Sequence, residues 1–325
     1  MRVLVTGGAG FFGSHVVAQL TRRGHEVTVL DDLSSGQKEN IAGTNAHFVQ
    51  ASVNDHGAVE SALKGVEAVL HMAVRNVRES LTNPVANHLV NDIGTLTILE
   101  ALRTQEESRP WFVYCSSSEV YGNTSTELLS DVSTVCRPAT VYGASKYAGE
   151  LLTHAYRETY GQPACVIRPF NVYGPQASMA PTGAELVTRF IAQALRGEPF
   201  TVFGDGAQRR DLSWVSDAAA GLVRVVESGE QLNGLTANLG SGFAPTVVEV
   251  AREVAQVTGV DPDHVAWIED RPGDVRCLRA DISTSVREFD YQAPTTLTTG
   301  IERLVTDFRA MIEVGSLPDF PPRNW

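Results

Sequence analysis

The first thirteen residues constrain the fold more than any other part of the chain. The apolar run Val3–Thr6 leads directly into Gly7-Gly8-Ala9-Gly10-Phe11-Phe12-Gly13, and an amphipathic stretch follows. In a turn between a strand and a helix, one glycine permits the tight bend, one lets a pyrophosphate approach the backbone, and one lets the helix pack closely on the strand. The free N–H groups at the start of the helix attract phosphate. The sequence therefore predicts that the chain opens with a dinucleotide-binding unit.

Short apolar runs alternate with amphipathic stretches through the first half of the chain. Runs of this length are typical of parallel strands that are buried on both faces. We predict strands at Val3–Thr6, Glu26–Leu30, His47–Gln50, Ala68–His71, Trp111–Tyr114 and Ala164–Arg168. Helical periodicity covers Phe11–Arg23, Asp55–Leu63, Pro84–Arg103 and Tyr142–Tyr160. Strands that alternate with helices predict an α/β fold with a Rossmann-like, doubly wound parallel sheet.

The pattern changes after Asn171, where loops rich in Gly and Pro separate shorter elements. We therefore predict two domains. Residues 1–170 form the dinucleotide-binding Rossmann domain, with returning segments near 211–238. Residues 171–325 form mainly a smaller α/β C-terminal substrate domain, which covers the carboxyl edge of the sheet, where ligands bind in such folds.

The balance of charge excludes several classes of partner. Asp and Glu total 38 against 26 Lys and Arg, which gives a formal net charge of -12. Binding to a phosphate backbone requires a basic footprint, so we expect no nucleic-acid partner and no anionic membrane partner. A small phosphorylated ligand needs only a few placed cations and stays compatible with this charge.

The cysteines indicate the redox environment. Cys115, Cys136, Cys165 and Cys277 are scattered and form no CxxC motif. We therefore expect neither a disulfide framework nor a zinc site, and no other metal, and a reducing cytosol fits this usage. No apolar run approaches the ~20 residues that span a bilayer. These features predict a cytoplasmic protein.

Asp31 stands at the end of the second predicted strand. In dinucleotide-binding folds, a carboxylate at this position accepts hydrogen bonds from the adenosine ribose, whereas a nearby arginine accommodates the 2′-phosphate of NADP. The acidic residue therefore favours NAD as the dinucleotide.

A tyrosine and a lysine lie one helical turn apart in Tyr142-Gly143-Ala144-Ser145-Lys146. Residues four apart share a helix face, and an ammonium close to a phenol favours the phenolate and lowers the pKa of the tyrosine. Such a tyrosine can take a proton from a hydroxyl while a hydride leaves the same carbon for the cofactor. By itself this spacing is more often a packed ring and a surface charge. Downstream of a dinucleotide fold, the catalytic interpretation is favoured.

Serines follow the fifth predicted strand in Cys115-Ser116-Ser117-Ser118-Glu119. The carboxyl ends of parallel strands are where ligands bind in α/β folds. A serine at this edge can donate a hydrogen bond to the reacting oxygen as that oxygen becomes a carbonyl. Without the Tyr/Lys pair, the same run would be read as an ordinary turn.

Together these motifs resemble the extended short-chain dehydrogenase/reductase family, and within it the NAD-dependent nucleotide-sugar epimerases and dehydratases such as the UDP-glucose 4-epimerases. The likeness extends over nearly the whole chain. Its specific elements are Gly7–Gly13, Asp31, Ser117, Tyr142 with Lys146, Arg168–Asn171, Tyr173–Pro175, Arg209–Asp211 and Arg271–Asp274. The resemblance implies NAD as the cofactor and a nucleotide-diphosphate sugar as the substrate.

The resemblance also implies the roles of the residues at the cofactor. Ser117 matches the serine that holds the reacting hydroxyl, Tyr142 the base, and Lys146 the residue that lowers the pKa of the base and binds the nicotinamide ribose. Where relatives commonly carry Gly-Asp after the third strand, this chain has Ala51-Ser52-Val53, so a hydroxyl would bind the adenine more weakly than the usual carboxylate. The implied cofactor contacts are Gly7, Gly10, Phe11, Phe12, Gly13, Asp31, Ser52, Val53, Ala73, Asn91, Tyr142, Lys146 and Pro169.

For the substrate, the resemblance implies a diphosphate site in the second half of the chain. Asn171 matches an asparagine that touches the diphosphate, and Arg210 and Arg271 match arginines that clamp it. Asp274 matches an acid near the nucleoside ribose. Two guanidinium groups that converge on a diphosphate form charge-assisted hydrogen bonds, which agrees with these assignments.

The stretch that follows the fourth strand departs from the family pattern. Relatives often carry Gly where this chain has Val74, and Arg75-Asn76-Val77-Arg78 follows. This stretch is expected near the substrate, as is Ser118. Arg75 and Arg78 could therefore bind an anionic sugar such as a uronate, or they could simply be exposed.

Glu119 leaves the reaction open. Many 4-epimerases of the family have a small residue there, whereas dehydratases and uronate decarboxylases have Glu, which removes the acidic C5 proton once C4 is a ketone. Ser118 precedes Glu119 here, and a hydroxyl is a poor proton donor to a leaving group. The first interpretation is a 4-epimerase that acts through a transient 4-keto intermediate, and the alternative is a 4,6-dehydratase or UDP-glucuronate decarboxylase that uses Glu119. Glu119 could also only bind backbone amides, and a non-catalytic NAD sensor or scaffold is a minor alternative.

The family resemblance has one implication for assembly. Relatives dimerise through two long helices, which match Pro84–Arg103 and Tyr142–Tyr160. The amphipathic pattern of a single helix does not separate dimer packing from core packing. The expected homodimer therefore depends on the resemblance alone.

Overall fold

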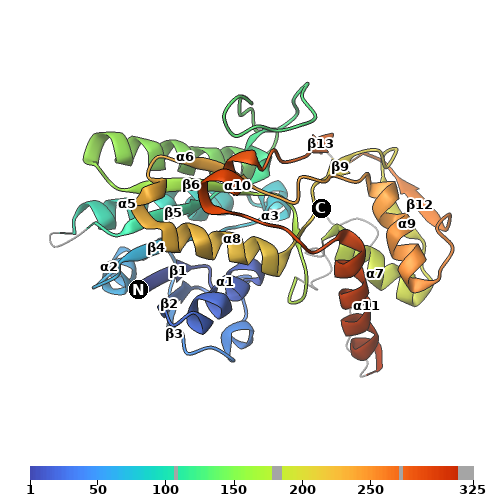
Figure 1. Cartoon of the computed structure of the whole chain (residues 1–325), viewed down its shortest axis with the longest axis horizontal. Coiled ribbons are helices and arrows are strands. Elements are labelled where there is room, and N and C mark those ends of the chain that lie inside the picture. The colour runs from blue at the N-terminus through green and yellow to red at the C-terminus, as the bar shows by residue number, and fades with distance from the viewer. Residues whose placement is uncertain (106–108, 178–184, 271–273, 314–325) are drawn as a thin grey trace.

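A parallel sheet of seven strands forms the centre of the molecule (Figure 1). The structure is a computed structural model that describes residues 1–105, 109–177, 185–270 and 274–313. The strand order is β11-β6-β5-β4-β1-β2-β3, so the order reverses direction at β1 and β4, where such sheets open a cleft at their carboxyl edge. The strands are β1 (Arg2–Thr6), β2 (Glu26–Asp31), β3 (His47–Gln50), β4 (Ala68–His71), β5 (Trp111–Cys115), β6 (Ala164–Pro169) and β11 (Thr236–Leu239). The predicted Rossmann-like fold is confirmed.

Six of these strands agree with the predicted runs to within one residue at each end. The strand β11 was not predicted, because its four residues include a polar side chain, Asn238, that interrupts the apolar run. The amide of Asn238 is buried and donates to the carbonyl oxygens of Leu129 and Asp281. The hydrogen-bond partners of this amide thus come from distant parts of the chain, which the local sequence does not reveal.

Alternate strand residues face opposite sides of the sheet, and helices cover both sides. On one side, Val3 and Val5 of β1 pack with α1 (Phe11–Arg22) and α8 (Val215–Ser228). On the other side, Leu4 of β1 packs with α2 (His56–Ala62), α5 (Gly94–Arg103) and α6 (Val141–Tyr160). This burial on both faces explains why the strands are nearly continuous apolar runs.

The predicted helix over Pro84–Arg103 is not uniform. It consists of α4 (Pro84–His88), a π-helical turn at Leu89–Ile93, and α5, and α3 (Val77–Thr82) precedes it. The backbone angles stay right-handed through this stretch, so the helix widens without breaking. The spacing of apolar residues in the sequence does not distinguish a helix with one π-helical turn from a regular α-helix.

Smaller elements pack beside the carboxyl edge of the sheet and form a second core (Figure 1). Three helices, α7 (Leu186–Arg196), α9 (Val247–Thr258) and α11 (Leu297–Glu313), share this core with the strand pair β8 (Phe200–Phe203) and β12 (Val265–Ile268). Short parallel pairs join β7 (Val172–Tyr173) to β10 (Ser213–Trp214) and β9 (Arg209–Arg210) to β13 (Cys277–Leu278). Between these elements the chain returns to the sheet through α8 and β11, and α10 (Ser283–Phe289) contacts both.

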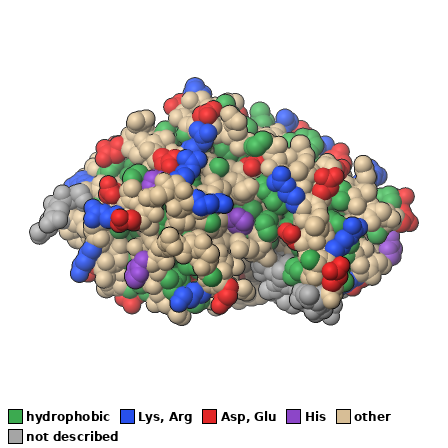
Figure 2. All heavy atoms as spheres, turned by 60° about the horizontal axis from the view of Figure 1, so that its bottom comes forward, with side chains coloured by type: hydrophobic (Ala, Val, Ile, Leu, Met, Phe, Trp, Pro, Cys, Tyr) green, Lys and Arg blue, Asp and Glu red, His purple; other side chains and the backbone are tan. Residues whose placement is uncertain are grey.

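Charged side chains of both signs are interspersed over the face shown in Figure 2. Helix α6, with 20 residues, contains Lys146, Glu150 and other charged residues. Among the described helices, none combines the length and apolar character required to cross a bilayer.

Candidate active site

The glycine-rich turn brings the backbone close to the strands. Gly7 has φ +71°, and a Cβ atom at this residue would lie 2.7 Å from the backbone nitrogen of Ala73, which follows β4. A Cβ atom at Gly13 would overlap the carbonyl oxygen of Gly7. Only glycine fits both positions, and helix α1 begins directly after the turn at Phe11. The amide groups of its first turn therefore face the edge of the sheet.

A cavity runs along this turn, and we call it the sheet-edge cavity. It encloses about 1690 Å³ including its open mouth. Most of the predicted cofactor contacts line it. These are Gly7, Gly10, Phe11, Phe12, Gly13, Asp31, Val53, Ala73, Tyr142, Lys146 and Pro169.

Asp31 fastens the turn to the second strand. One carboxylate oxygen accepts a hydrogen bond from the backbone N–H of Ala9 at 3.0 Å, and the other accepts from that of Leu33 at 2.9 Å. Burial raises the pKa of Asp31, and the two amide bonds oppose that rise. A carboxylate oxygen has a further lone pair, so Asp31 can bind a hydroxyl at the cavity wall while it holds the turn.

Two of the predicted cofactor contacts do not line either cavity described here. The hydroxyl of Ser52 accepts a hydrogen bond from the backbone N–H of Asn54 at 3.2 Å. Asn91 is fully buried and binds the backbone of Arg75, to whose carbonyl oxygen it donates and from whose N–H it accepts. Asn91 thus supports the loop after β4 from behind. Its position in the π-helical turn accounts for this inward orientation.

Tyr142, Ser117 and Lys146 meet in the sheet-edge cavity. Burial raises the pKa of Tyr142 well above its ordinary value, and a hydrogen bond with Ser117 opposes the rise. Burial lowers the pKa of Lys146 to about 8. The ammonium lies 4.4 Å from the centre of the Tyr114 ring, which is a favourable cation–π contact. Within the chain itself, burial thus disfavours the charged forms of both Lys146 and Tyr142.

A buried ion pair that the sequence analysis missed lies under this helix. Glu150, one turn beyond Lys146, binds Arg168 of β6 through two hydrogen bonds of 2.9 and 2.7 Å. Ser116, beside Ser117, donates to the same carboxylate. The pair joins α6 to the ends of β5 and β6, where the site residues lie. The spacing of Tyr142, Lys146 and Glu150 at four-residue intervals is the sequence signal that could have revealed it.

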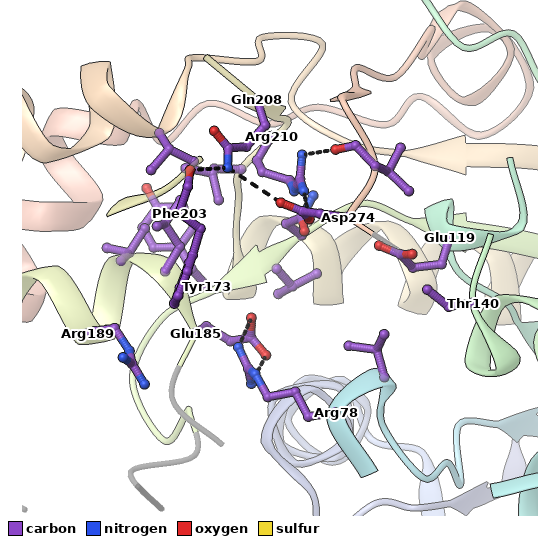
Figure 3. A pocket seen from close by; sticks show the side chains of 18 of the residues that line it. Arg78, Glu119, Thr140, Tyr173, Glu185, Arg189, Phe203, Gln208, Arg210 and Asp274 are labelled. Carbon is purple, nitrogen blue, oxygen red and sulfur yellow. Dashed lines mark hydrogen bonds and ion pairs between the residues drawn. The ribbon is translucent and has the colours of Figure 1, made fainter. Parts of the chain in front are cut away.

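A second cavity adjoins the first, and two of the charged residues predicted for the substrate, Arg210 and Asp274, line it (Figure 3). Five residues line both cavities, and we call this shared zone the junction: Val77, Glu119, Asn171, Val172 and Glu185. Because the two cavities share these walls, one ligand can extend from the sheet edge into the second cavity.

Arg210 and Asp274 face each other in the second cavity. A nitrogen of Arg210 donates to the Asp274 carboxylate at 2.5 Å, and another donates to the carbonyl oxygen of Val275 at 2.7 Å. Gln208 binds the same carboxylate at 3.4 Å. Asn171 lines the junction and donates to the carbonyl oxygen of Asp211 at 3.3 Å. Arg271, the other arginine of the predicted clamp, lies outside the described residues.

Glu119 and Ser118 follow Ser117 at the end of β5. Ser118 is buried and lines the sheet-edge cavity, whereas Glu119 lines the junction. The backbone N–H of Glu119 donates to the Ser117 hydroxyl at 3.2 Å. The charge of Glu119 contributes to the raised pKa of Tyr142, after burial and Cys115. The carboxylate is therefore electrostatically coupled to the predicted base.

The two arginines after β4 point to different partners. Arg75 binds Glu79 at 3.0 Å and lies 3.8 Å from Asp32, and it lines neither described cavity. Arg78 lines the second cavity and forms a forked pair with Glu185, with N···O distances of 3.2 and 3.4 Å (Figure 3). Of the two, Arg78 is the one that lines the second cavity.

Comparison with known proteins identifies the family. Residues 3–240 match the NAD dependent epimerase/dehydratase family. The chain belongs to this family. A putative UDP-glucose 4-epimerase from Methanocaldococcus jannaschii is 33% identical over 306 residues, which are 93% of this chain and 97% of the relative. The UDP-glucuronic acid decarboxylase 1 of Arabidopsis thaliana is 34% identical over 323 residues, which are 96% of this chain and 71% of the relative.

Solved structures of the family have the same fold. The UDP-glucose 4-epimerase of Thermotoga maritima, crystallised with UDP-glucose, is 31% identical, with a TM-score of 0.89 over 96% of this chain and 100% of that chain. The dTDP-glucose 4,6-dehydratase of Streptomyces venezuelae, crystallised with NAD, is 30% identical, with a TM-score of 0.88 over 95% of this chain and 97% of that chain. Epimerases, dehydratases and decarboxylases are similar to this chain to nearly the same degree, so family membership does not select the reaction.

NAD is the cofactor of this family, and the sheet-edge cavity fits it. A Cβ atom would fill the cradle at Gly7 and Gly13, through which a pyrophosphate can approach the backbone. Asp31 offers a carboxylate at the end of β2 and no arginine lines this cavity among the described residues, which suits a free ribose 2′-hydroxyl. When bound, NAD accepts and returns a hydride.

Proposed function

We propose that this protein is a nucleotide-sugar 4-epimerase that acts through a transient 4-keto sugar. The observation that carries the proposal is the shared cavity of Tyr142, Ser117 and Lys146, which continues into a charged cavity with Arg210. The first group of residues suits a carbinol that is to be oxidised, and the second suits a diphosphate that holds the sugar. A ligand held by its diphosphate can turn its sugar without leaving the site.

Tyr142 acts as the base and Ser117 as the hydrogen-bonding group. Tyr142 removes the proton of the C4 hydroxyl as hydride leaves C4 for NAD, and the C4–O bond becomes a carbonyl. Ser117 donates a hydrogen bond to that oxygen. After the 4-keto sugar turns, hydride returns to the opposite face of C4 and Tyr142 returns the proton. The hydride and the proton that leave the sugar in the first step both return to it, so NAD is regenerated in each turnover.

The residues around Tyr142 oppose its ionisation, so a further positive charge is needed to form the phenolate. Burial and the charges of Cys115, Glu119 and Glu185 raise the pKa of Tyr142. The ammonium of Lys146 and the positive ring of oxidised NAD both favour the phenolate. This dependence predicts that the tyrosine becomes a competent base only in the complex with oxidised cofactor.

The proposal is tested by offering the purified enzyme UDP- and dTDP-hexoses and following the products by NMR and mass spectrometry. A 4-epimerase produces the C4 epimer with unchanged mass, needs no added NAD, and carries bound NAD(H) that is released on denaturation. Activity that requires stoichiometric NAD and accumulates NADH would contradict the proposal and indicate a net dehydrogenase.

Glu119 supports a second candidate function. Its side chain lines the junction beside the predicted base, where a carboxylate can remove the C5 proton of a 4-keto sugar. In a 4,6-dehydratase, this deprotonation would be followed by loss of the C6 hydroxyl as water. In a decarboxylase acting on a uronate, carbon dioxide would leave as the C5–C6 bond breaks toward the 4-ketone, and Glu119 would instead serve to protonate C5 afterwards. Ser118 argues against a dehydratase, because its hydroxyl is a poor proton donor to a departing hydroxide. A product lighter by the mass of water or carbon dioxide would favour this candidate, and Glu119→Gln would then abolish a loss of water.

The assembly and location complete the proposal. Leu81, Val85, Leu89 and Ile93 are exposed at four-residue intervals along α3 to α5, and Leu151 of α6 is also exposed. We propose that these helices form the interface of a homodimer, because such a stripe otherwise leaves apolar area in water. Light scattering should give twice the mass of the chain, and Val85→Asp should reduce it to one chain. The scattered free cysteines fit a protein of the reducing cytoplasm.

A further inference from the structure

Among the described residues, the junction between the two cavities is lined by two carboxylates and by no cation. Glu119 and Glu185 both line it, and Arg78, which lines the second cavity, pairs with Glu185. The side chain of Arg78 is 12% exposed and that of Glu185 is 49% exposed, so the carboxylate reaches solvent while the guanidinium is largely enclosed. Figure 3 shows the two side chains pointing toward each other. On the sheet side, the nearest cation that lines the cavity is Lys146.

Both carboxylates lie close enough to Tyr142 to influence the pKa of its phenol. The charges of Glu119 and Glu185 each contribute to the raised pKa of Tyr142, so both lie within electrostatic reach of the phenol. In a hexose, C6 is attached to C5, the neighbour of the reacting C4. Any charge on C6 is therefore held close to the two carboxylates when C4 faces Tyr142.

The pairing of Arg78 decides which C6 groups are tolerated. A carboxylate at C6 would have to displace Glu185 from Arg78 or lie beside two like charges, and like charges at close range are unfavourable. A C6 hydroxyl or methyl group carries no charge and avoids both alternatives. The ion pair thus occupies the cation that could otherwise bind a uronate.

We propose that Glu185, through its ion pair with Arg78, makes the junction select nucleotide sugars whose C6 carries no negative charge. This specificity rests on the proposed 4-epimerase function, because that function places C4 at Tyr142. It is nevertheless measurable by binding alone. The contacts come from α3 and from the residue before α7, so two elements far apart in the sequence would set the selectivity together.

The test compares UDP-glucose with UDP-glucuronate on the enzyme as purified with its cofactor. Calorimetry gives the Kd of each ligand, and NMR gives its kcat/KM as a 4-epimerase substrate. The wild type should prefer UDP-glucose. Glu185→Gln removes one carboxylate and releases Arg78 from it, so the ratio of UDP-glucuronate to UDP-glucose binding should rise about tenfold. Arg78→Gln leaves Glu185 in place and should lower the same ratio.

A matched control is Glu227→Gln, which removes the carboxylate of a pair with Arg23 that lines neither described cavity. This variant should leave the ratio unchanged. A wild-type preference for UDP-glucuronate, or an unchanged ratio in Glu185→Gln, overturns the inference. If the binding ratio shifts as expected but no hexose is epimerised, the selectivity stands and the proposed reaction is wrong. If UDP-glucose is epimerised and the ratio does not move, the reaction stands and the selectivity is wrong.

Discussion

The two sides of the reaction centre hold their charged groups in different ways. Under helix α6, the side chains of Glu150 and Arg168 are 1% and 7% exposed. In the second cavity, those of Asp274 and Arg210 are 23% and 13% exposed. Removing one partner of a buried pair strands the other in a medium of low polarity, whereas a pair near water can change partners at little cost.

The difference in exposure suits the two ion pairs to different roles. The buried pair ties α6 to the ends of β5 and β6, so it holds the atoms that react in a constant arrangement. Under the proposed function, the pair in the second cavity would contact the ligand and rearrange when a diphosphate binds. Substitutions on the sheet side should therefore change turnover or the free energy of unfolding, and substitutions in the second cavity should change KM or selectivity.

The largest expected effect is on turnover and comes from Tyr142→Phe. This substitution removes only the phenolic oxygen, so kcat for epimerisation should fall about a thousandfold, within the range for loss of a general base. The melting temperature and the bound NAD(H) should stay as in the wild type, since the ring still fills its site. Unchanged turnover would remove Tyr142 from the chemistry and favour a non-catalytic sensor or scaffold.

The next effect is on stability. Glu150→Gln leaves Arg168 buried without a carboxylate and should lower the free energy of unfolding by about 3–5 kcal/mol. Urea denaturation followed by circular dichroism measures this change. The control is Asp205→Asn, in an exposed pair with Arg276 whose side chains are 59% and 62% exposed, and it should cost less than about 1 kcal/mol. Equal losses in the two variants would contradict the division between the two sides.

The sheet side was also the part that the sequence predicted well. Strands buried on both faces, the glycine turn, Asp31 and the Tyr142/Lys146 spacing are all local patterns, and local patterns are legible in one chain. The fold and most of the sheet-edge cavity follow from them. Asn91 was expected at the cofactor, and its inward direction depends on a π-helical turn that the periodicity does not encode.

The contacts of the second cavity were not predictable in the same way. Arg78 and Glu185 are separated by 107 positions, and Arg210 and Asp274 by 64. Which arginine meets the ligand depends on packing between distant elements, so Arg75 and Arg78 looked equivalent in the sequence. Only the fold distinguishes them, because it directs Arg75 to Asp32 and Glu79.

A smaller effect should appear in the pH dependence. Burial lowers the pKa of Lys146 to about 8, so the ammonium that favours the phenolate is lost above that pH. We expect kcat/KM to fall by about tenfold per pH unit above 8, and we expect Lys146→Arg, which keeps its charge, to lose this decline. Stability runs in the opposite direction. The unfolded chain keeps the ordinary pKa of 10.5, so the cost of burying the charge is complete below pH 8 and shrinks as the pH rises toward 10.5.

A variant without the titrating amine isolates the contribution of Lys146 to the pH dependence of stability. The stability of the wild type relative to Lys146→Met should improve between pH 8 and 10.5, because methionine does not titrate and other groups cancel. A constant difference across this range would mean that the lysine is not desolvated. In that case the pH profile of activity would have to arise from another group.

The smallest expected effect lies in the second cavity. Asp274→Asn weakens the hold on Arg210, but the guanidinium keeps its bonds to the carbonyl oxygens of Arg209 and Val275. The KM for the nucleotide sugar should therefore rise only about threefold, with kcat and the free energy of unfolding nearly unchanged, since this pair is in partial contact with solvent and Arg210 keeps its other hydrogen bonds. Initial rates over a range of substrate concentrations measure both constants. A large fall in kcat would mean that this pair, like Glu150 and Arg168, fixes the reacting atoms, and the division between the two sides would fail.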